Sequence, residues 1–284
     1  MPELPEVETI RRQLEPALVG RRIERAEIND ARLTRPYEPL PVAADLVGQR
    51  IVALDRRGKY LIVRFASSAS LLVHLRMTGS FRVAERGTLP NDLHRRAIVR
   101  LDNGSDVAYR DVRRFGTWLL LAPGELDPYL ASRLGPEPLD PAFTAHIFAA
   151  RLAHRRAPIK AVILDQRTLA GVGNIYADEA LWIAQLHPLR EAAGLESGEI
   201  TALHHAIRAV LEQGIERQGS TLRDYTQPDG SYGEMQDEFR VYGRGDDPCE
   251  RCGSPIEKTR VAGRGTSYCP ICQPITAART NAVQ

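Results

Sequence analysis

Four cysteines near the C-terminus form a pattern typical of a metal site. Two C-x2-C pairs are separated by sixteen residues, and their members are Cys249, Cys252, Cys269 and Cys272. Such pairs can supply four thiolates to one tetrahedral Zn²⁺ ion, and a site closed by four thiolates leaves no position for water or substrate. The intervening residues read as two strands around the turn AGRG, which would hold Arg260 and Arg264 on a rigid hairpin. We therefore predict one structural zinc ion, with disulfides as the alternative.

The first residues of the chain are suited to covalent catalysis. The sequence begins Met-Pro-Glu, and removal of the initiator Met would leave Pro2 with a free secondary amine. An α-amino group has a pKa of about 7.7–8.0, so a useful fraction is neutral at physiological pH. A neutral amine can attack an aldehyde-level carbon and form an iminium, and the adjacent Glu3 could transfer a proton. Helix capping is the alternative role for Pro and Glu at this position.

Lysine is rare in this chain. Of 38 basic residues only Lys59, Lys160 and Lys258 are lysines. Arginine cannot release a proton near neutral pH, whereas lysine can. The lysines are therefore candidates for proton transfer, with chance survival in an arginine-rich composition as the alternative.

The chain divides into two halves with different hydrophobic periods, and their elements must position these candidate residues. Val7, Ile10, Leu14 and Leu18 recur at helical spacing and predict a helix over residues 3–18. From about residue 22 to 122 the pattern shifts toward the two-residue period of strands, with a hairpin signal at Asp102-Asn103-Gly104. The first half is therefore predicted as one helix plus a β-sandwich or flattened barrel.

The second half returns to a helical period after a linker rich in Pro and Gly. A glycine-rich turn, LAGVG, precedes Asn174, which can open a helix whose backbone N–H groups could take a phosphate. Polar residues dominate 219–240 and predict a loop. The predicted helices are 143–155, 158–166, 174–185 and 198–218.

Composition narrows the class of protein. The chain has 284 residues, 43% of them apolar, and no apolar run near the length of a membrane span. The first residues carry carboxylates where a secretory signal has a basic and then an apolar region, so we expect an intracellular protein. A net charge of +2 neither requires nor excludes nucleic acid.

Motifs spread over nearly the full length resemble the formamidopyrimidine-DNA glycosylase family. They are MPELPEVETIRRQLEP, GKYL, HLRMTG, DVRRFG, LDQRTLAGVGNIYADEAL, VYGR and CxxCG…GRGTSYCPICQ, in that order. The resemblance implies a bifunctional base-excision repair enzyme that removes 8-oxoguanine and formamidopyrimidines and cleaves the strand by β,δ-elimination. It implies an α+β fold with an N-terminal helix and β-sandwich, a helix–two-turns–helix domain and a zinc finger. The expected domains are 1–124, a linker 125–142, 143–240 with a lesion-capping loop 219–240, and 241–284.

The resemblance also implies roles for individual residues. Pro2 would be the nucleophile at C1′ and Glu3 the proton donor that opens the sugar ring. Lys59 would be the proton donor in β-elimination, and Arg264 would act in δ-elimination. The implied DNA-contacting residues are His74, Met77, His94, Arg113, Phe115, Arg156, Lys160 and Asn174. Among these, Met77, Arg113 and Phe115 would fill the space left by a flipped base, with core packing as the alternative for the apolar two.

Two departures and three alternatives qualify the resemblance. Arg76 stands where the family often has Gly, and Val112 stands where it often has Pro. The nearest alternative is an endonuclease VIII-like enzyme for oxidised pyrimidines, which tends to have Gly at the position of Leu4. The others are a non-catalytic damaged-DNA-binding zinc-finger protein and a zinc ribbon that contacts only protein. We expect a cytoplasmic bacterial monomer, associated with the nucleoid through double-stranded DNA with oxidised bases or abasic sites, and no membrane partner.

Overall fold

The computed structural model describes residues 1–221 and 227–275, and the chain divides into two compact units. The first unit is built from residues 1–133 together with 214–236, and the second from 134–213 together with 237–284. The chain thus leaves the first unit and returns to it, a discontinuity that the sequence patterns did not predict. The four segments expected as domains remain a prediction.

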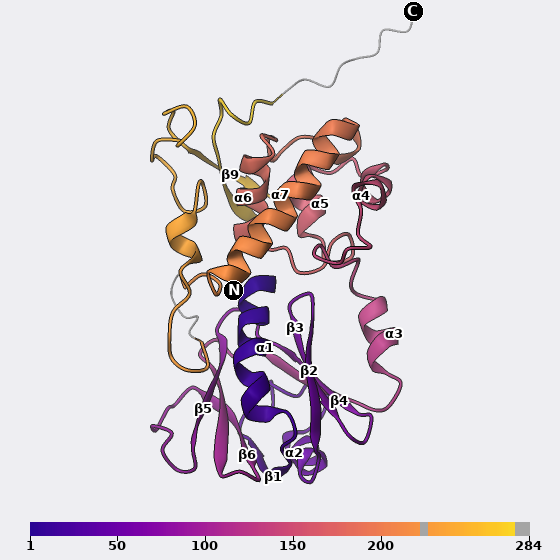
Figure 1. Cartoon of the computed structure of the whole chain (residues 1–284), viewed down its shortest axis with the longest axis vertical. Coiled ribbons are helices and arrows are strands. Elements are labelled where there is room, and N and C mark those ends of the chain that lie inside the picture. The colour runs from indigo at the N-terminus through magenta and orange to yellow at the C-terminus, as the bar shows by residue number, and fades with distance from the viewer. Residues whose placement is uncertain (222–226, 276–284) are drawn as a thin grey trace, which may run out of the picture. The chain divides into compact units, whose positions relative to one another are not determined.

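Helix α1, Leu4–Leu18, opens the first unit (Figure 1). A capping box starts it, because the Glu3 side chain accepts from a backbone N–H of the first turn and Glu6 accepts from the backbone of Glu3. Its apolar face is buried at Val7, Ile10, Leu14 and Leu18, as the helical spacing predicts. Burial of this apolar face holds α1, and with it the N-terminus of the helix, against the core.

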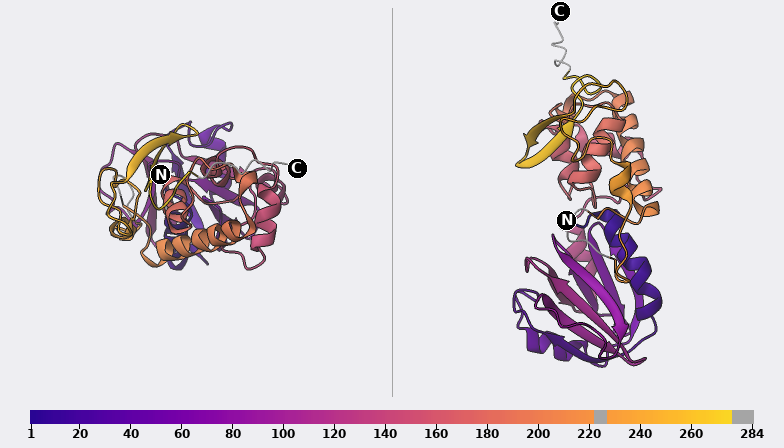
Figure 2. Two further views of the ribbon diagram at one scale, coloured as in Figure 1. Left: turned by 90° about the horizontal axis from the view of Figure 1, so that it is seen from above. Right: turned by 90° about the vertical axis from the view of Figure 1, so that its left-hand side faces the viewer.

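Two antiparallel four-stranded sheets form most of the first unit beside α1 (Figure 2). The apolar cluster is shared by both sheets and α1, which confirms the predicted sandwich. The Asp102-Asn103-Gly104 turn joins two paired strands of one sheet, as predicted. In sheet order that sheet is β1 (Ile23–Ile28), β6 (Arg95–Leu101), β7 (Ser105–Asp111) and β5 (Gly79–Glu85). The other is β2 (Ile51–Arg57), β3 (Tyr60–Phe65), β4 (Ser70–His74) and β8 (Thr117–Leu121).

Two short helices of the first unit were not predicted. Helix α2, Pro39–Leu46, interrupts the region expected to be strands. Helix α3, Leu126–Ala131, lies inside the expected linker 125–142. Each has only one or two turns, which is too short for a helical period to stand out in sequence. Tertiary burial of residues such as Leu46 and Leu130 stabilises them instead.

The second unit is helical and ends in a β-hairpin. The predicted helices are confirmed as α4 (Ala145–Leu152), α5 (Ile159–Leu164), α6 (Asn174–Ile183) and α7 (Ser197–Glu216). Each ends two or three residues earlier than predicted, and α7 begins one residue earlier. Short 3-10 turns occur at η1 (Ala192–Gly194) and η2 (Met235–Glu238). The hairpin pairs β9 (Glu257–Val261) with β10 (Arg264–Tyr268), and β10 packs against α6. Among the described residues, no helix combines the length and hydropathy needed to cross a bilayer.

Candidate functional site

Pro2 and Glu3 lie at the buried N-terminus of α1. Both side chains are buried, whereas Met1 is exposed. The backbone N–H of Glu3 donates to Glu6 Oε2 at 2.8 Å. Glu3 therefore caps the helix and stands beside the candidate nucleophile, so the capping and catalytic interpretations are compatible.

Glu6 connects this N-terminus to the start of the predicted loop 219–240. Its Oε1 accepts from the Ser220 backbone N–H at 2.8 Å and from the Ser220 hydroxyl at 3.1 Å. A Cβ on Gly219 would lie 2.8 Å from Glu6 Cγ, and Gly219 has φ +79°, so glycine is required there. Sequence reasoning assigned Glu6 no function, although its place in the capping box was visible. Residues 222–226 of the predicted loop lie outside the described residues.

Lys59 occupies the tight turn between β2 and β3. The flanking residues Arg57 and Tyr60 pair directly, which leaves Gly58 and Lys59 as a two-residue loop. Gly58 has φ +57°, as the first position of such a turn favours. The lysine is buried although it lies in a turn. The GKYL motif is therefore a hairpin that places an amine at a strand end.

His74 ends β4 in a setting that keeps its ring neutral. Burial, followed by the charges of Arg76 and Lys59, lowers the pKa of His74 to about 3. Its Nδ1 accepts from the Arg76 backbone N–H at 3.0 Å, so the ring proton resides on Nε2. The ring also packs edge-on against Tyr60, with centroids 4.8 Å apart. His74 can therefore donate a hydrogen bond without carrying a charge.

Met77 and Phe115 are exposed, which contradicts the core alternative for them. Their exposed fractions are 39% and 51%. The Arg113 guanidinium stands 5.2 Å from the centroid of the Phe115 ring. Two exposed apolar side chains and an arginine thus protrude from neighbouring loops of the first unit, as a wedge for a DNA stack requires.

Asp111 ties the two loops that carry these residues. One of its oxygens accepts from the Thr78 hydroxyl, and the other accepts from the Gly116 backbone N–H at 2.7 Å. The Arg113 backbone N–H in turn donates to Thr78 Oγ1 at 3.0 Å. The two motifs HLRMTG and DVRRFG therefore form one hydrogen-bonded assembly.

The glycines that end these motifs have a steric cause. A Cβ on either Gly79 or Gly116 would overlap the hydroxyl of the buried Tyr109. Arg76, the departure noted above, has φ +53°, in the left-handed region that glycine adopts freely. The loop thus keeps a backbone conformation that suits glycine while holding an arginine.

In the second unit, Lys160 is a buried amine, and its predicted contact with DNA stays a prediction. Its side chain is 0% exposed, and Nζ lies 2.6 Å from Asp178 Oδ1. Nζ also donates to Thr266 Oγ1 at 2.7 Å and to the Gly265 carbonyl at 3.1 Å. These contacts support the hairpin from its buried side. Burial raises the pKa of Asp178 to about 7 against the opposing effect of Lys160.

Asn174 contacts the hairpin at the residue next to Arg264. Asn174 opens α6, as predicted, and its Nδ2 donates to the Gly265 carbonyl at 2.9 Å. Arg264 is exposed and pairs with Val261 across a two-residue turn. Two helices, through Lys160 and Asn174, therefore fix the residue that follows Arg264.

Two further candidates lie apart from these clusters. Arg156 is exposed in the segment between α4 and α5 of the second unit. His94, in the first unit, is half-buried, and its Nδ1 lies 3.3 Å from Arg96 Nη2. Arg156 is therefore placed to meet a ligand, whereas His94 is partly engaged by its neighbour.

The four cysteines converge as the spacing predicts. All four sulfur atoms lie within 4.8 Å of one another. The Cys249 and Cys272 sulfurs are 3.9 Å apart, and those of Cys252 and Cys269 are 3.5 Å apart. A tetrahedral site with Zn–S bonds of about 2.3 Å requires sulfurs about 3.8 Å apart. The residues present therefore fit one zinc ion with no open coordination position.

Sequence comparisons with known proteins cover nearly the whole chain. Residues 1–118 match the formamidopyrimidine-DNA glycosylase N-terminal domain, 134–226 its H2TH domain, and 246–275 a zinc finger found in FPG and IleRS. Formamidopyrimidine-DNA glycosylase of Symbiobacterium thermophilum is 48% identical, over 97% of this chain and 90% of the relative. That of Geobacillus kaustophilus is 47% identical over 96% of this chain and 100% of the relative.

The chain belongs to the formamidopyrimidine-DNA glycosylase family. It is a DNA glycosylase of base-excision repair with a structural zinc finger, as the motifs indicate. Membership therefore decides for an enzyme over a binding module or a protein-contacting zinc ribbon.

Solved members of the family share the fold. Lactococcus lactis Fpg in complex with abasic-site DNA matches with a TM-score of 0.90 and 39% identity, over 96% of this chain and 99% of that one. The wild-type L. lactis protein with an oxidised-pyrimidine DNA matches with a TM-score of 0.89 and 39% identity, over 96% and 100%. These agreements confirm the α+β architecture and the H2TH and zinc-finger parts.

Proposed function

We propose that this glycosylase excises oxidised purines from double-stranded DNA and then cleaves the strand at the resulting abasic site. The observation that carries the proposal is the buried Pro2–Glu3 pair at the start of α1, in the same unit as the buried Lys59. A nucleophilic nitrogen, an adjacent carboxyl group and an amine are the groups that iminium chemistry needs. Neither a redox step nor a catalytic metal is part of this scheme.

The reaction balances with these groups and water. The Pro2 nitrogen bonds to C1′ while the bond to the base breaks, and the proton that the nitrogen loses passes to the departing base. Glu3 protonates O4′, the sugar ring opens, and the nitrogen lone pair completes the iminium. Water takes up the C2′ proton as the phosphate at C3′ leaves with a proton from Lys59. In a second elimination water takes up the C4′ proton, and the positive charge of Arg264 stabilises the phosphate that leaves C5′. Hydrolysis of the iminium then frees the Pro2 nitrogen.

We assign the exposed wedge to base flipping. Met77 and Phe115 would occupy the gap in the stack, and Arg113 would face the orphaned base with its guanidinium donors. Extruding a base costs a few kcal/mol, which the inserted side chains partly offset. The hydrogen bonds of Asp111 support this role because they hold both wedge loops in place.

The remaining candidates are proposed as contacts to the DNA backbone. His74 would donate to a phosphate from Nε2 as a neutral ring. Arg156 and Arg264 would supply charge from exposed positions. His94 and Asn174 would contribute polar contacts, and Lys160 supports the hairpin.

The substrate branch separates this proposal from its nearest alternative. Leu4 in the first turn of α1 and the Met77–Phe115 wedge favour oxidised purines. Endonuclease VIII-like activity on oxidised pyrimidines uses the same nucleophile, so only substrate preference distinguishes the two. One L. lactis relative is solved with an oxidised-pyrimidine DNA, which makes a direct comparison necessary.

Borohydride trapping tests the nucleophile and the substrate branch together. The protein is first shown by mass to begin at Pro2. It is then incubated with a duplex that carries 8-oxoguanine opposite cytosine and, separately, with a duplex that carries thymine glycol. A covalent adduct mainly on the first duplex is expected. The matched control carries one extra residue before Pro2, which turns its nitrogen into an amide, and should give no adduct. An adduct from this blocked form, or none from the native form, would refute the nucleophile assignment.

We also propose that the enzyme acts as a monomer on a single duplex, associated with the bacterial nucleoid through DNA. A single repair site requires only one protein chain to engage the lesion. Light scattering of the free protein and of a one-to-one DNA complex should give one chain in each. A stable dimer in the complex would contradict the proposal.

A further inference from the structure

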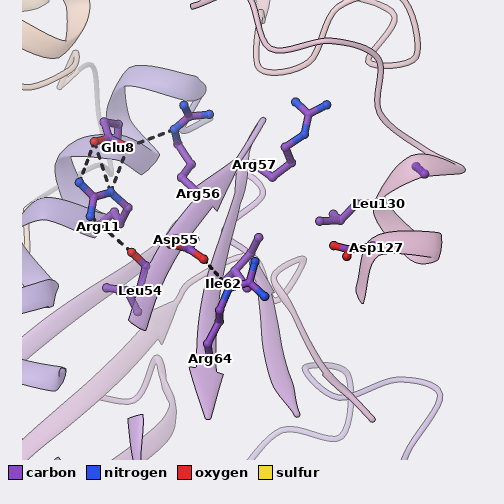
Figure 3. Close-up of a pocket in the computed structure, with 11 residues that line it drawn as sticks. Glu8, Arg11, Leu54, Asp55, Arg56, Arg57, Ile62, Arg64, Asp127 and Leu130 are labelled. Carbon is purple, nitrogen blue, oxygen red and sulfur yellow. Dashed lines mark hydrogen bonds and ion pairs between the residues drawn. The ribbon is translucent and has the colours of Figure 1, made fainter. Parts of the chain in front are cut away.

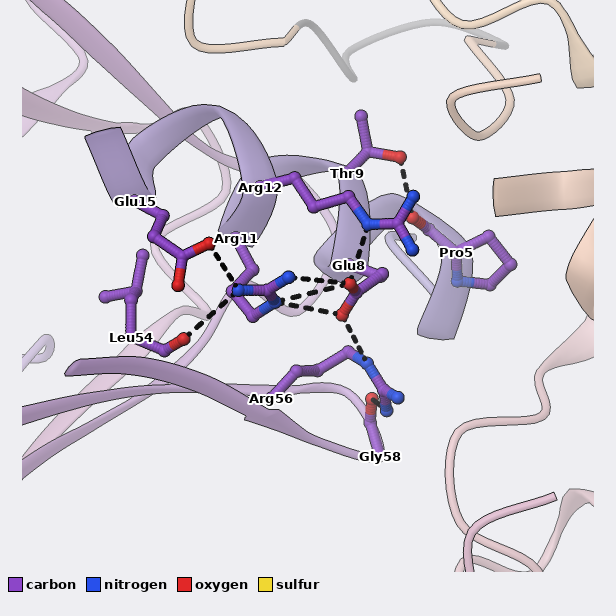
Figure 4. Close-up of polar contacts among 9 residues, drawn as sticks. All are labelled: Pro5, Glu8, Thr9, Arg11, Arg12, Glu15, Leu54, Arg56 and Gly58. Carbon is purple, nitrogen blue, oxygen red and sulfur yellow. Dashed lines mark hydrogen bonds and ion pairs between the residues drawn. The ribbon is translucent and has the colours of Figure 1, made fainter. Parts of the chain in front are cut away.

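Glu8 is a buried carboxylate at the centre of an arginine cluster on α1. Its Oε1 accepts from Arg11 at 3.0 Å and from Arg12 at 2.8 Å, while its Oε2 accepts from Arg56 at 3.2 Å (Figure 4). Arg11 and Arg12 belong to the same helix, whereas Arg56 belongs to β2. Glu8 is therefore a link between the helix that begins with Pro2 and Glu3 and the sheet that carries Lys59.

The link continues from Arg56 to the turn that holds Lys59. Arg56 Nη1 donates to the Gly58 carbonyl at 3.1 Å, and this carbonyl belongs to the peptide bond that Gly58 shares with Lys59. A second contact fixes the same edge, since Arg11 Nη1 donates to the Leu54 carbonyl at 3.4 Å. An unbroken path of polar contacts thus runs from α1 through one arginine to the lysine turn.

The charges of this path are satisfied within the protein. A pocket of about 530 Å³ opens beside it, lined in part by Arg57, Arg64 and Asp127 (Figure 3). Arg64 pairs with Asp55, and Arg56 pairs with Glu8, so these two arginines of the pocket wall form ion pairs within the protein. Burial would raise the pKa of Glu8, but hydrogen bonds from Arg11 and Arg12 and the Arg56 charge hold it below its usual range. The carboxylate is therefore ionised at neutral pH.

We propose that Glu8 and Arg56 are positioning residues that set the place of the Lys59 amine relative to the Pro2 iminium. The inference rests on the proposed function, in which Pro2 forms the iminium and Lys59 donates the proton in β-elimination. Neither Glu8 nor Arg56 touches substrate in this scheme. Their effect is to hold α1 and β2 at a fixed distance, because the Glu8 carboxylate on α1 is bound by Arg56 on β2.

This role predicts an effect on one chemical step and not on the other. Iminium formation depends on Pro2 and Glu3, which the capping box with Glu6 holds at the start of α1. Strand scission also depends on where the Lys59 amine stands. A misplacement of about 1 Å can cost about 100-fold in rate, so a looser turn should slow scission selectively.

The experiment uses the full-length zinc protein in excess over a duplex with a preformed abasic site. One arm measures the rate of the borohydride-trapped adduct, and the other measures strand scission without borohydride. For Glu8→Gln and for Arg56→Gln we expect scission to slow about tenfold while trapping stays within about twofold. The double variant should be no slower than the slower single variant, because both changes break one path.

The matched control is Arg12→Gln, which removes a different partner of Glu8. The Arg12 side chain is 59% exposed and has no part in the path to Gly58. Its two rates should stay within about twofold of the native rates. Thermal unfolding of each variant confirms that it is folded under the assay conditions.

The outcomes separate the inference from the proposed function. If Glu8→Gln scission matches the native rate, or if trapping and scission fall in parallel, the positioning role is wrong. If the native protein itself forms no adduct, the iminium proposal fails and the inference fails with it. Selective loss of scission in both single variants, with a silent Arg12→Gln, supports the inference.

Discussion

At the scale of single residues, buried ionisable groups dominate the behaviour of this glycosylase. His74 and Lys160 were both proposed from the sequence as contacts to DNA. The structure places His74 in a neutral state at a strand end and Lys160 in an ion pair without exposed surface. The two residues thus carry the same sequence prediction but lie in different environments. Each environment has a measurable consequence for stability.

Acidification should destabilise the protein through His74. A histidine whose pKa is lowered to about 3 in the fold binds fewer protons than in the unfolded chain. Its stabilising contribution is complete above the unfolded pKa of about 6.5 and is lost as pH falls below that value. Between pH 7 and pH 5 the expected loss is about 2 kcal/mol in the free energy of unfolding.

Denaturant unfolding at both pH values tests this prediction. The variant His74→Gln lacks the titrating ring and should show a pH dependence that is flatter by about that amount. An unchanged difference between pH 7 and pH 5 in this variant would show that His74 is not the source.

Removing the Lys160 amine should be costly because Asp178 would remain buried. For Lys160→Met we expect a loss of about 3–5 kcal/mol in the free energy of unfolding, as for other broken buried pairs. The double variant Lys160→Met/Asp178→Leu should recover much of this loss, since no buried charge is left. Urea unfolding measures both. A single-variant loss below about 1 kcal/mol would contradict a structural role for the pair.

At the scale of elements, hairpins and helix termini place the candidate chemistry. The β2–β3 turn carries Lys59, the N-terminus of α1 carries Pro2 and Glu3, and the β9–β10 turn precedes Arg264. Each is a terminus or a tight turn on a rigid scaffold, where a side chain can be presented while the backbone stays paired. The wedge loops that carry Met77 and Phe115 are also held rigid, by hydrogen bonds to Asp111 and not by strand pairing.

Loss of zinc should release the β9–β10 hairpin. The small cluster of Trp182, Val241 and Ile256 that surrounds two cysteines offers little core of its own, so metal binding must supply much of its stability. Cys252→Ser is expected to lower the zinc content below one ion per chain and to weaken DNA binding about tenfold or more through misplacement of Arg264.

Metal analysis and DNA titration on the same sample check this expectation. Gly253→Ala changes the neighbouring position without removing a thiolate and should keep one zinc ion, although its φ of +75° adds some backbone strain. Native DNA affinity in a zinc-free Cys252→Ser protein would contradict the role assigned to the hairpin.

At the scale of the whole molecule, both units are expected to contribute charge to a DNA complex. Arg113 belongs to the first unit, and Arg156 and Arg264 belong to the second. Phosphate contacts release counterions, so the binding constant should fall steeply as salt rises. Because the net charge is only +2, the salt dependence of DNA binding should come from arginines placed at the contacts and not from the overall charge.

Salt titration of DNA binding resolves these contacts one by one. Arg156→Gln and Arg264→Gln should each reduce the slope of log K against log salt by about 1. Arg25→Gln is the matched control, because Arg25 is exposed on β1, pairs with Glu27 and has no proposed contact with DNA. Its slope should match that of the native protein. An unchanged slope for Arg156→Gln would remove that residue from the interface.

Several elements followed from local patterns in the sequence. Helix α1, the four helices of the second unit, the Asp102–Gly104 turn and the cysteine hairpin all depend on neighbours within a few residues. Helices α2 and α3 were missed because one or two turns carry too little periodicity. The zinc site was readable because its four ligands lie in two short pairs whose spacing suits one ion.

The sequence alone determined what depends on residue type and short-range spacing: the family motifs, the candidate nucleophile and the metal ligands. Only the tertiary structure decided the burial of Lys160, the neutral ring of His74, the hold of Glu6 on Ser220 and the path from Glu8 to the Lys59 turn. Each of these joins residues from separate elements, and the contact of Glu6 with Ser220 joins residues 214 positions apart. Desolvation and pairing of a charge depend on what the fold packs around it, which local sequence does not contain.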